Sequence, residues 1–199
     1  MASSYAQQMP RRPRVLVPNG IYHVTSRGNR RQETFVDSRD YQVFLALLAA
    51  ISIRREWRCR GYCLMPNHYH LVLETPGADL SEGMQHLNGE YAQCFNRFHG
   101  YDGHVFQGRY YSILVESDWH LAELSRYLAL NPVRAGLTRS AREWRWSSYR
   151  AMAEGTAAPP FLTVEPVLAF FGHSVERARK AFVDFVEGTL PLVQRGMPL

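Results

Sequence analysis

The feature that most constrains the fold is a pair of alternating segments joined by a two-residue turn. Residues 57–65 (WRCRGYCLM) and 68–75 (HYHLVLET) have the pattern of strands, and Pro66-Asn67 between them is typical of a tight turn. The sequence therefore predicts a β-hairpin. Because successive strand residues point to opposite faces, His68 and His70 share one face of the predicted sheet, and Tyr69 packs on the other.

The remaining elements complete an alternating order of strands and helices. We expect a strand at 21–27, helices at 39–56, 80–100 and 117–131, a strand-like run at 109–117 and a helical tail at 164–188. Asp37 or Ser38 caps the first helix in this interpretation, Ser117 or Asp118 caps the third, and Pro132 stops it. The order fits an α+β fold with a ferredoxin-like βαββαβ core, an antiparallel sheet with helices on one face, and a C-terminal helical extension. We divide the chain into a basic N-terminal arm (1–18), a main domain (19–152) and the extension (153–199).

Positive charge is concentrated in the first third of the chain. The net charge of the chain is +5. Residues 1–60 alone have a charge of +7, since they hold 11 Arg and four acidic residues, and the rest of the chain has a charge of −2. Of the 23 basic residues only Lys180 is a lysine, and the guanidinium group of Arg suits phosphate oxygens. This distribution favours a nucleic-acid partner, whereas the Arg excess alone is equally explained by a GC-rich coding sequence.

Composition excludes two classes of protein. A hydrophobic fraction of 46% is that of a folded globular chain and excludes wholesale disorder. No apolar run approaches the roughly 18 residues that span a bilayer, and no secretory signal is visible, so no membrane partner is expected. The three cysteines favour a reducing compartment over a disulfide framework, and we expect a cytoplasmic protein.

Four side chains have the spacing of a metal-dependent site. His68 and His70, about 7 Å apart on one strand face, can hold one divalent ion. Tyr127 and Asn131 lie four residues apart on one helix face, where an amide oxygen can ligate a hard cation beside the phenol. Each has a plainer explanation: a His-x-His strand is often only packed, and Tyr127 fits a helix core. Cys59 and Cys63 with the two histidines also make a possible zinc set, C-x3-C-x4-H-x-H, although no usual structural spacing matches it.

Four longer blocks, taken together and in this order, resemble a known family. They are GNRRQETFVDSRD, YCLMPNHYHLVLE, HLNGEYAQCFNRFHGYDGHVFQGRYYSILVES and LSRYLALNPVRAGL, within about 20–152. They resemble the single-tyrosine (HUH), IS200-like transposases, and among these the REP-associated tyrosine transposases. The resemblance implies that His68 and His70 bind the metal, that Asn131 completes its site, and that Tyr127 is the nucleophile.

The resemblance also implies an activity and partners. The activity is Mg²⁺- or Mn²⁺-dependent cleavage and strand transfer of single-stranded DNA with hairpin structure, through a 5′-phosphotyrosine, by a monomer or homodimer. Tyr110 and Tyr111 are competing candidates for the nucleophile. A non-catalytic DNA- or RNA-binding regulator of the same fold is the alternative, and a replication initiator or relaxase is a third option. Six arginines are expected to hold phosphates: Arg11, Arg12, Arg14, Arg27, Arg30 and Arg31.

Overall fold

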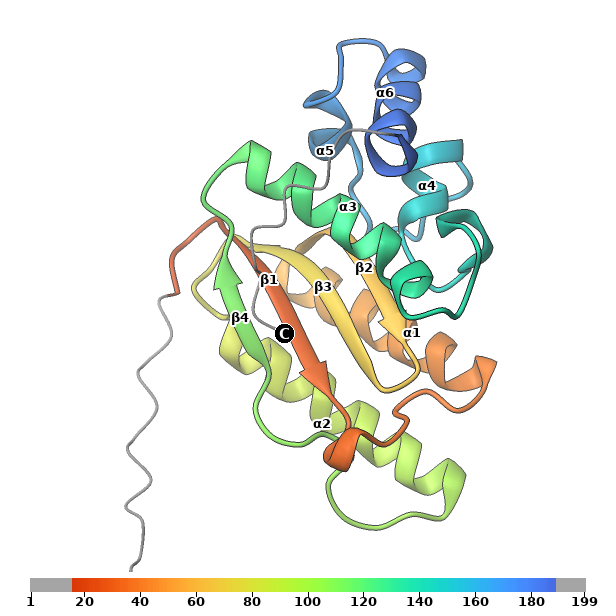
Figure 1. Cartoon of the computed structure of the whole chain (residues 1–199). Helices are drawn as coiled ribbons and strands as arrows, with labels where there is room; N and C mark the ends of the chain where they lie inside the picture. Colours follow the sequence, from red (N-terminus) through yellow and green to blue (C-terminus); the bar gives the residue numbers. More distant parts are fainter. Residues whose placement is uncertain (1–15, 189–199) are drawn as a thin grey trace, which may run out of the picture.

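The computed structural model describes residues 16–188 and confirms the predicted βαββαβ order (Figure 1). The core comprises β1 (Gly20–Arg27), α1 (Ser38–Arg55), β2 (Arg58–Met65), β3 (His68–Thr75), α2 (Leu80–His99) and β4 (Tyr111–Leu114). The 3-10 turn η1 (Asn29–Arg31) follows β1, and α3 (Asp118–Arg134) follows β4. The C-terminal part holds η2 (Ala141–Glu143), α4 (Tyr149–Glu154), α5 (Glu165–Ala169) and α6 (Val175–Glu187). Most of the predicted basic arm lies outside the described residues.

The four strands form one antiparallel sheet in the order β2-β3-β1-β4. The predicted hairpin is confirmed, because β2 and β3 pair directly and Pro66-Asn67 is the turn between them. In the register of β1 against β3, Thr25 faces His70 and Arg27 faces His68. The sheet therefore places the two histidines beside the end of β1.

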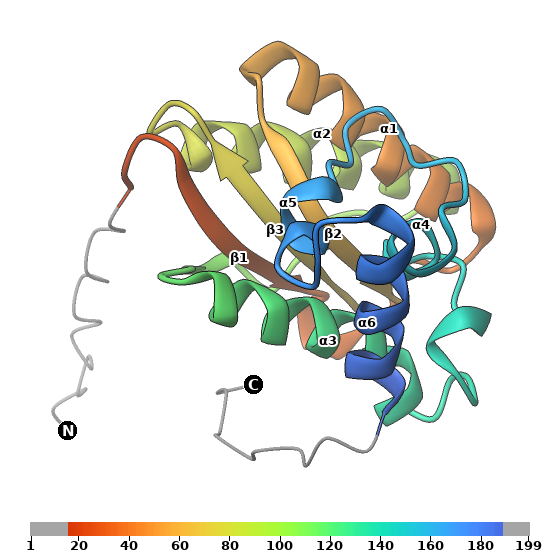
Figure 2. The same ribbon diagram turned by 90° about the horizontal axis from the view of Figure 1, so that it is seen from above.

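The helices lie on both faces of the sheet. Figures 1 and 2 show α1 and α2 on one face and α3 across the other. The expectation that the helices of the βαββαβ core lie on one face is thus confirmed for α1 and α2, and α3, which follows the core, covers the other face. The physical reason is that both faces are apolar at the β2–β3 pair, where seven of eight residues in each strand are buried, so one helical layer cannot cover them. Helix α3 covers the second face and contributes buried Leu121, Leu124 and Leu128.

The core on the α1/α2 side is rich in aromatic rings. The ring centroid of Phe44 lies 4.8 Å from that of Tyr69 and 5.2 Å from that of Tyr91. Tyr69 is fully buried there, as its position between the two histidines predicted, and its hydroxyl donates to Asn88 Oδ1 at 2.6 Å. This packing orients β3 so that His68 and His70 point toward α3.

One predicted helix end is wrong, and one predicted strand is too long. Helix α3 does not stop at Pro132 but continues to Arg134, because proline's fixed φ is helical and the final carbonyls find other donors. Ala135 N–H donates to the Asn131 carbonyl at 3.0 Å, and Leu137 N–H to the Pro132 carbonyl at 2.9 Å. The predicted helical tail at 164–188 is confirmed and comprises two helices, α5 and α6, separated around Gly172, whose φ of 156° does not continue a helix. The predicted 109–117 strand shortens to the four residues of β4.

The expected helix caps are present. The Asp37 carboxylate accepts from the backbone N–H groups of Arg39 and Asp40 at the start of α1. Ser117 Oγ accepts from His120 N–H at 3.1 Å at the start of α3. Each cap satisfies backbone donors that the first helical turn leaves unpaired, so both helix starts could be read from the sequence.

The C-terminal segment packs against the edge of the sheet. Cys59 N–H donates to the Phe161 carbonyl at 3.1 Å, and Thr163 N–H to the Cys59 carbonyl at 2.8 Å. The boundary at residue 152 between main domain and extension stays a prediction. Among residues 16–188, no helix is long and apolar enough to cross a membrane.

Candidate active site

Two histidine rings meet on the α3 side of β3. The ring centroids of His68 and His70 are 5.0 Å apart at an interplanar angle of 85°. Burial, together with nearby Arg27, lowers the pKa of His68 to about 4. Burial, with the neighbouring histidines and Arg27, lowers the pKa of His70 well below its ordinary value. Both imidazoles are therefore neutral at neutral pH, which is the state that ligates a metal.

Helix α3 brings Tyr127 and Asn131 to these rings. Asn131 Nδ2 lies 3.0 Å from His70 Nε2, and the Tyr127 ring meets the His70 ring edge-on at a centroid distance of 5.3 Å. The four candidate residues thus lie together, although β3 and α3 are more than 40 residues apart in the sequence.

The phenol of Tyr127 is partly buried beside positive charge. Burial raises its pKa above the ordinary value, whereas the Arg134 guanidinium and a hydrogen bond with the Asn131 side chain oppose that rise. The Arg134 Cζ atom lies 5.7 Å from the centre of the Tyr127 ring. The Tyr127 phenol is therefore neutral at pH 7. The Arg134 guanidinium beside it would attract a negatively charged phosphate.

One residue of the site was not predicted from the sequence. His23 Nε2 lies 3.0 Å from His70 Nδ1, and the two rings stack with centroids 5.2 Å apart. Burial, with a smaller contribution from His120, lowers the pKa of His23 to about 4. The 21–27 strand pattern placed His23 on one face with Arg27, but only the register of β1 against β3 brings it to His70.

The donor set fits a divalent cation. His68 Nδ1 is hydrogen-bonded to Asn67 Oδ1 at 2.7 Å and His70 Nδ1 to His23 Nε2, so Nε2 is the nitrogen of each ring that could ligate an ion. On His70 this nitrogen contacts Asn131 Nδ2 in the structure, so the amide would have to turn to admit an ion. Asn131 would present its Oδ1, since the amide nitrogen is a donor only. Two imidazole nitrogens and one amide oxygen form a mixed donor set, in which the nitrogens favour a transition-metal ion and the oxygen favours a hard cation.

The alternative zinc set is not assembled. Cys59 Sγ donates to the Gly61 carbonyl at 3.3 Å, and Cys63 Sγ contacts Met65 Sδ at 3.7 Å. Burial raises the pKa of Cys59 to about 12, so the thiol stays protonated. Within residues 16–188, no three His, Cys, Asp or Glu side chains gather in a way that could hold a metal.

Of the two competing tyrosines, one lies on the other side of the sheet and one at its exposed edge. Tyr110 is buried, with its hydroxyl 3.1 Å from Ser81 Oγ of α2, on the opposite side of the sheet. Tyr111 is 56% exposed and pairs with Thr25 at the sheet edge. Of the three tyrosines, Tyr127 is the one whose ring contacts His70.

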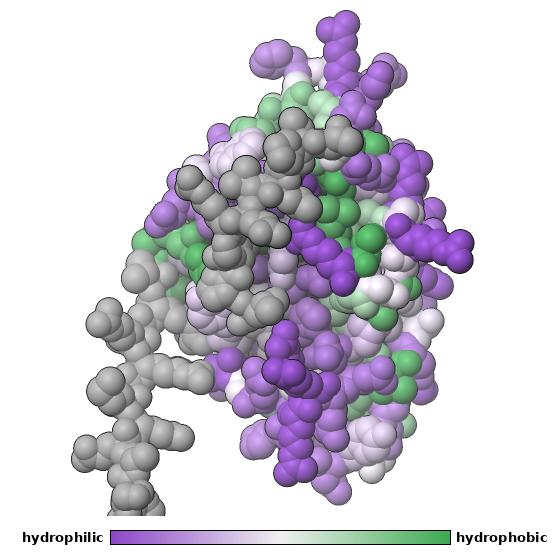
Figure 3. Space-filling model, viewed as in Figure 1, coloured by the Kyte–Doolittle hydropathy of each residue, from purple (hydrophilic) through white to green (hydrophobic). Residues whose placement is uncertain are grey.

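Three of the predicted phosphate-binding arginines border this site. Arg27 ends β1, opposite His68, and Arg30 and Arg31 follow in the exposed turn η1. This turn is tied to the hairpin, because Gly28 N–H donates to the Asn67 carbonyl at 2.8 Å and Asn67 Nδ2 donates to the Arg31 carbonyl at 3.3 Å. Hydrophilic residues project from the same lower end of the molecule, where β1 ends (Figures 1 and 3). Arg11, Arg12 and Arg14 lie outside the described residues.

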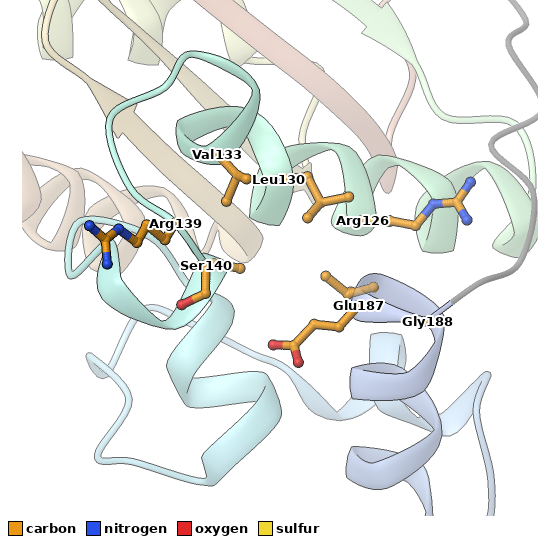
Figure 4. Close-up of a pocket in the computed structure, with 9 residues that line it drawn as sticks. Arg126, Leu130, Val133, Arg139, Ser140, Glu187 and Gly188 are labelled. Atoms are coloured by element: carbon orange, nitrogen blue, oxygen red, sulfur yellow. The ribbon is translucent and has the colours of Figure 1, made fainter.

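The opposite face of α3 lines a separate cavity of about 400 Å³. Arg126, Leu130 and Val133 contribute from α3, and Glu187 and Gly188 from the end of α6 (Figure 4). Tyr127 and Asn131 do not line this cavity. Helix α3 therefore lies between the histidine cluster and the end of α6.

Comparison with known proteins agrees with this arrangement. The family model "Transposase IS200 like" matches residues 16–131, which is more than half of the chain. A Haemophilus influenzae protein named "Putative REP-associated tyrosine transposase" is 24% identical over 98 residues, which are 44% of this chain and 56% of the relative. The matched region thus spans little more than half of that relative's length.

A solved structure shares the fold. It is a REP-associated tyrosine transposase bound to a REP hairpin, 19% identical, with a TM-score of 0.63 over 75% of this chain and 89% of the other. The match to the family model over residues 16–131 includes both histidines, Tyr127 and Asn131. The chain belongs to the IS200-like transposase family.

Proposed function

We propose that this protein cleaves and rejoins single-stranded DNA with hairpin structure through a tyrosine nucleophile, in a metal-dependent reaction. The observation that carries the proposal is the contact between Asn131 Nδ2 and His70 Nε2, with the Tyr127 ring against the same imidazole. A nucleophile, two neutral imidazoles and an amide converge from two separate elements. Packing alone does not require four polar side chains at one point of a sheet face.

Tyr127 is the proposed nucleophile. Its Oη forms a bond to the phosphorus, the bond from phosphorus to the 3′ oxygen breaks, and the phenol proton is lost while the departing oxygen gains one. The products are a 5′-phosphotyrosine and a free 3′-hydroxyl. Because one phosphoester replaces another, the reverse reaction rejoins strands without a nucleoside triphosphate.

Surrounding residues orient these groups. Arg134, 5.7 Å from the Tyr127 ring, is placed to favour negative charge on the phenol oxygen and the phosphate. His68 Nε2, His70 Nε2 and Asn131 Oδ1 would hold the Mg²⁺ or Mn²⁺ ion. When bound, the ion supplies Lewis-acid polarisation of the scissile phosphate.

The basic end of the sheet is the proposed DNA-binding surface. Arg27 lies opposite His68, and Arg30 and Arg31 are exposed; we propose that they contact the DNA backbone, since an Arg fork binds phosphate at two points. Among the solved structures, the relative of similar fold is bound to a REP hairpin, which supports a hairpin substrate here. Arg11, Arg12 and Arg14 are proposed to extend this contact. Whether the protein acts as monomer or homodimer stays a prediction.

The experiment is a strand-cleavage assay with end-labelled hairpin DNA from the sequence flanking the gene. With Mn²⁺ or Mg²⁺, we expect 5′-labelled DNA to give a free labelled fragment and 3′-labelled DNA to give a labelled protein band on a denaturing gel, and neither product in EDTA. His68→Ala should remove both products while hairpin binding persists. Binding without cleavage by the wild-type protein at any metal concentration would contradict the proposal and favour the non-catalytic regulator.

A further inference from the structure

We infer that His23 is a positioning residue that holds His70 in the tautomer required of a metal ligand. This inference rests on the proposed metal site. His23 is 8% exposed on β1 and reaches across to β3, so that its Nε2 lies 3.0 Å from His70 Nδ1. Nothing in the proposed reaction uses His23 directly.

The hydrogen bonds of His70 determine which nitrogen carries its proton. Asn131 Nδ2 is a donor only, so His70 Nε2 accepts from it. A neutral imidazole with an accepting Nε2 carries its proton on Nδ1 and donates it to His23 Nε2. In this tautomer the lone pair of Nε2, which accepts from Asn131 Nδ2 in this structure, is the one that a cation would use once Asn131 presents its Oδ1 instead. The contact with His23 therefore stabilises the ligand form of His70.

The other histidine has an equivalent partner. His68 Nδ1 lies 2.7 Å from Asn67 Oδ1, an acceptor at the hairpin turn. Outer hydrogen bonds of this kind fix the ring orientation of metal-bound histidines, and their loss typically weakens metal binding roughly 10- to 100-fold. His23 and Asn67 thus act on the two histidines in the same way.

Packing adds a second constraint. The His23 ring stacks on His70 at an interplanar angle of 23° and meets the Tyr127 ring edge-on, with centroids 6.2 Å apart. A ring of similar size without an acceptor keeps this packing and removes the hydrogen bond. His23→Phe is therefore the informative variant. His23→Gln is its partner, because glutamine places an amide oxygen at a similar reach from the backbone.

The test measures Mn²⁺ binding without DNA, by following free Mn²⁺ with electron paramagnetic resonance. We expect His23→Phe to weaken Mn²⁺ binding roughly 10- to 100-fold and His23→Gln to stay within about threefold of the wild type. Thermal unfolding and hairpin binding in EDTA serve as controls and should be unchanged in both variants. Wild-type affinity in His23→Phe would overturn the inference while leaving the proposed function intact. If the wild-type protein itself binds no Mn²⁺, both the inference about His23 and the proposed metal-dependent function are contradicted.

A second measurement needs no substitution. Long-range ¹H–¹⁵N correlation spectra of the metal-free wild-type protein report the tautomer of each histidine. We expect the proton of the His70 ring to be on Nδ1. We also expect the signals of His70 and His68 to be the first that broaden when Mn²⁺ is added. A proton on His70 Nε2 would overturn the assignment of His23 as its acceptor, whatever the stability of the variants.

Discussion

Asn131 Nδ2 of α3 lies 3.0 Å from His70 Nε2 of β3, and this hydrogen bond joins the two elements that carry the candidate active site. The residues are 61 positions apart in the sequence. Because the Tyr127 ring also contacts His70, any displacement of α3 from the sheet separates the proposed nucleophile from the proposed metal-binding pair. The geometry of the whole site therefore depends on how α3 packs against the second face of the sheet.

Replacing Asn131 tests this relationship. Asn131→Leu removes the oxygen ligand and the link to His70 but keeps a helix-forming side chain, so we expect the rate of DNA–protein adduct formation to fall at least about 100-fold. Asn131→Gln retains an amide and should recover part of that rate. The comparison uses single-turnover kinetics at saturating Mn²⁺. Equal rates for Asn131→Leu and the wild type would remove Asn131 from the metal site.

The free energy of unfolding should fall as the pH drops from about 6.5 to 4. The pKa of His23 is about 4 in the folded protein and 6.5 when unfolded, so the unfolded state binds the additional proton in this window. His23, which is 8% exposed, alone contributes up to about 3 kcal/mol of this loss. Urea unfolding at several pH values measures the slope. His23→Phe should show a shallower slope, and identical slopes would contradict the burial of a neutral His23.

Removing the arginines at the end of β1 should weaken DNA binding in a salt-dependent manner. For Arg27, Arg30 and Arg31 all changed to Ala, we expect the slope of log affinity against log salt to fall by about 2, because roughly 0.7 counterions are released per phosphate neutralised on single strands. The matched control changes Arg54, Arg150 and Arg177 to Ala, which removes the same amount of charge. These three residues are exposed on α1, α4 and α6. An equal loss of slope in the control would mean that net charge matters and that the position of the arginines does not.

Gly28 holds the turn that carries Arg30 and Arg31. A Cβ added there would lie 2.1 Å from the Gln32 carbonyl oxygen, so Gly28→Ala forces the backbone to move and should destabilise the protein by about 1–3 kcal/mol. Gly89→Ala is the control, because this exposed position in α2 has no atom within 4 Å of an added Cβ. It should stabilise the protein by about 0.5–1 kcal/mol. Chemical unfolding of both variants measures the difference, and a stabilising Gly28→Ala would contradict the described turn.

Local signals in the sequence predicted most of the core. The hairpin turn at Pro66-Asn67, the caps at Asp37 and Ser117 and the alternation around Tyr69 depend on neighbouring residues, and the structure agrees with each. The end of α3 was predicted wrongly, because the cost of a proline depends on which carbonyls later residues can satisfy. The donors are the backbone N–H groups of residues 135–137, which fold back onto the carbonyls of residues 131–133.

The candidate site likewise has a part that local sequence patterns predict and a part that they do not. His68 with His70, and Tyr127 with Asn131, are short-range pairs that strand and helix periodicity bring to one face. The contact of His70 with Asn131 depends on how α3 packs on the sheet. The contact of His70 with His23 depends on the register of β1 against β3. No periodicity in a single sequence specifies register between distant strands, which is why His23 was missed.

The most direct test of the account is to identify the residue that becomes covalently attached to DNA. The protein is incubated with hairpin DNA and Mn²⁺, digested, and analysed by mass spectrometry for a nucleotide-modified peptide, with Tyr127→Phe in parallel. We predict a 5′-phosphotyrosine at Tyr127 and no adduct in Tyr127→Phe, although this variant binds the hairpin normally. An adduct that persists in Tyr127→Phe, or one that maps to Tyr110 or Tyr111, would contradict the account.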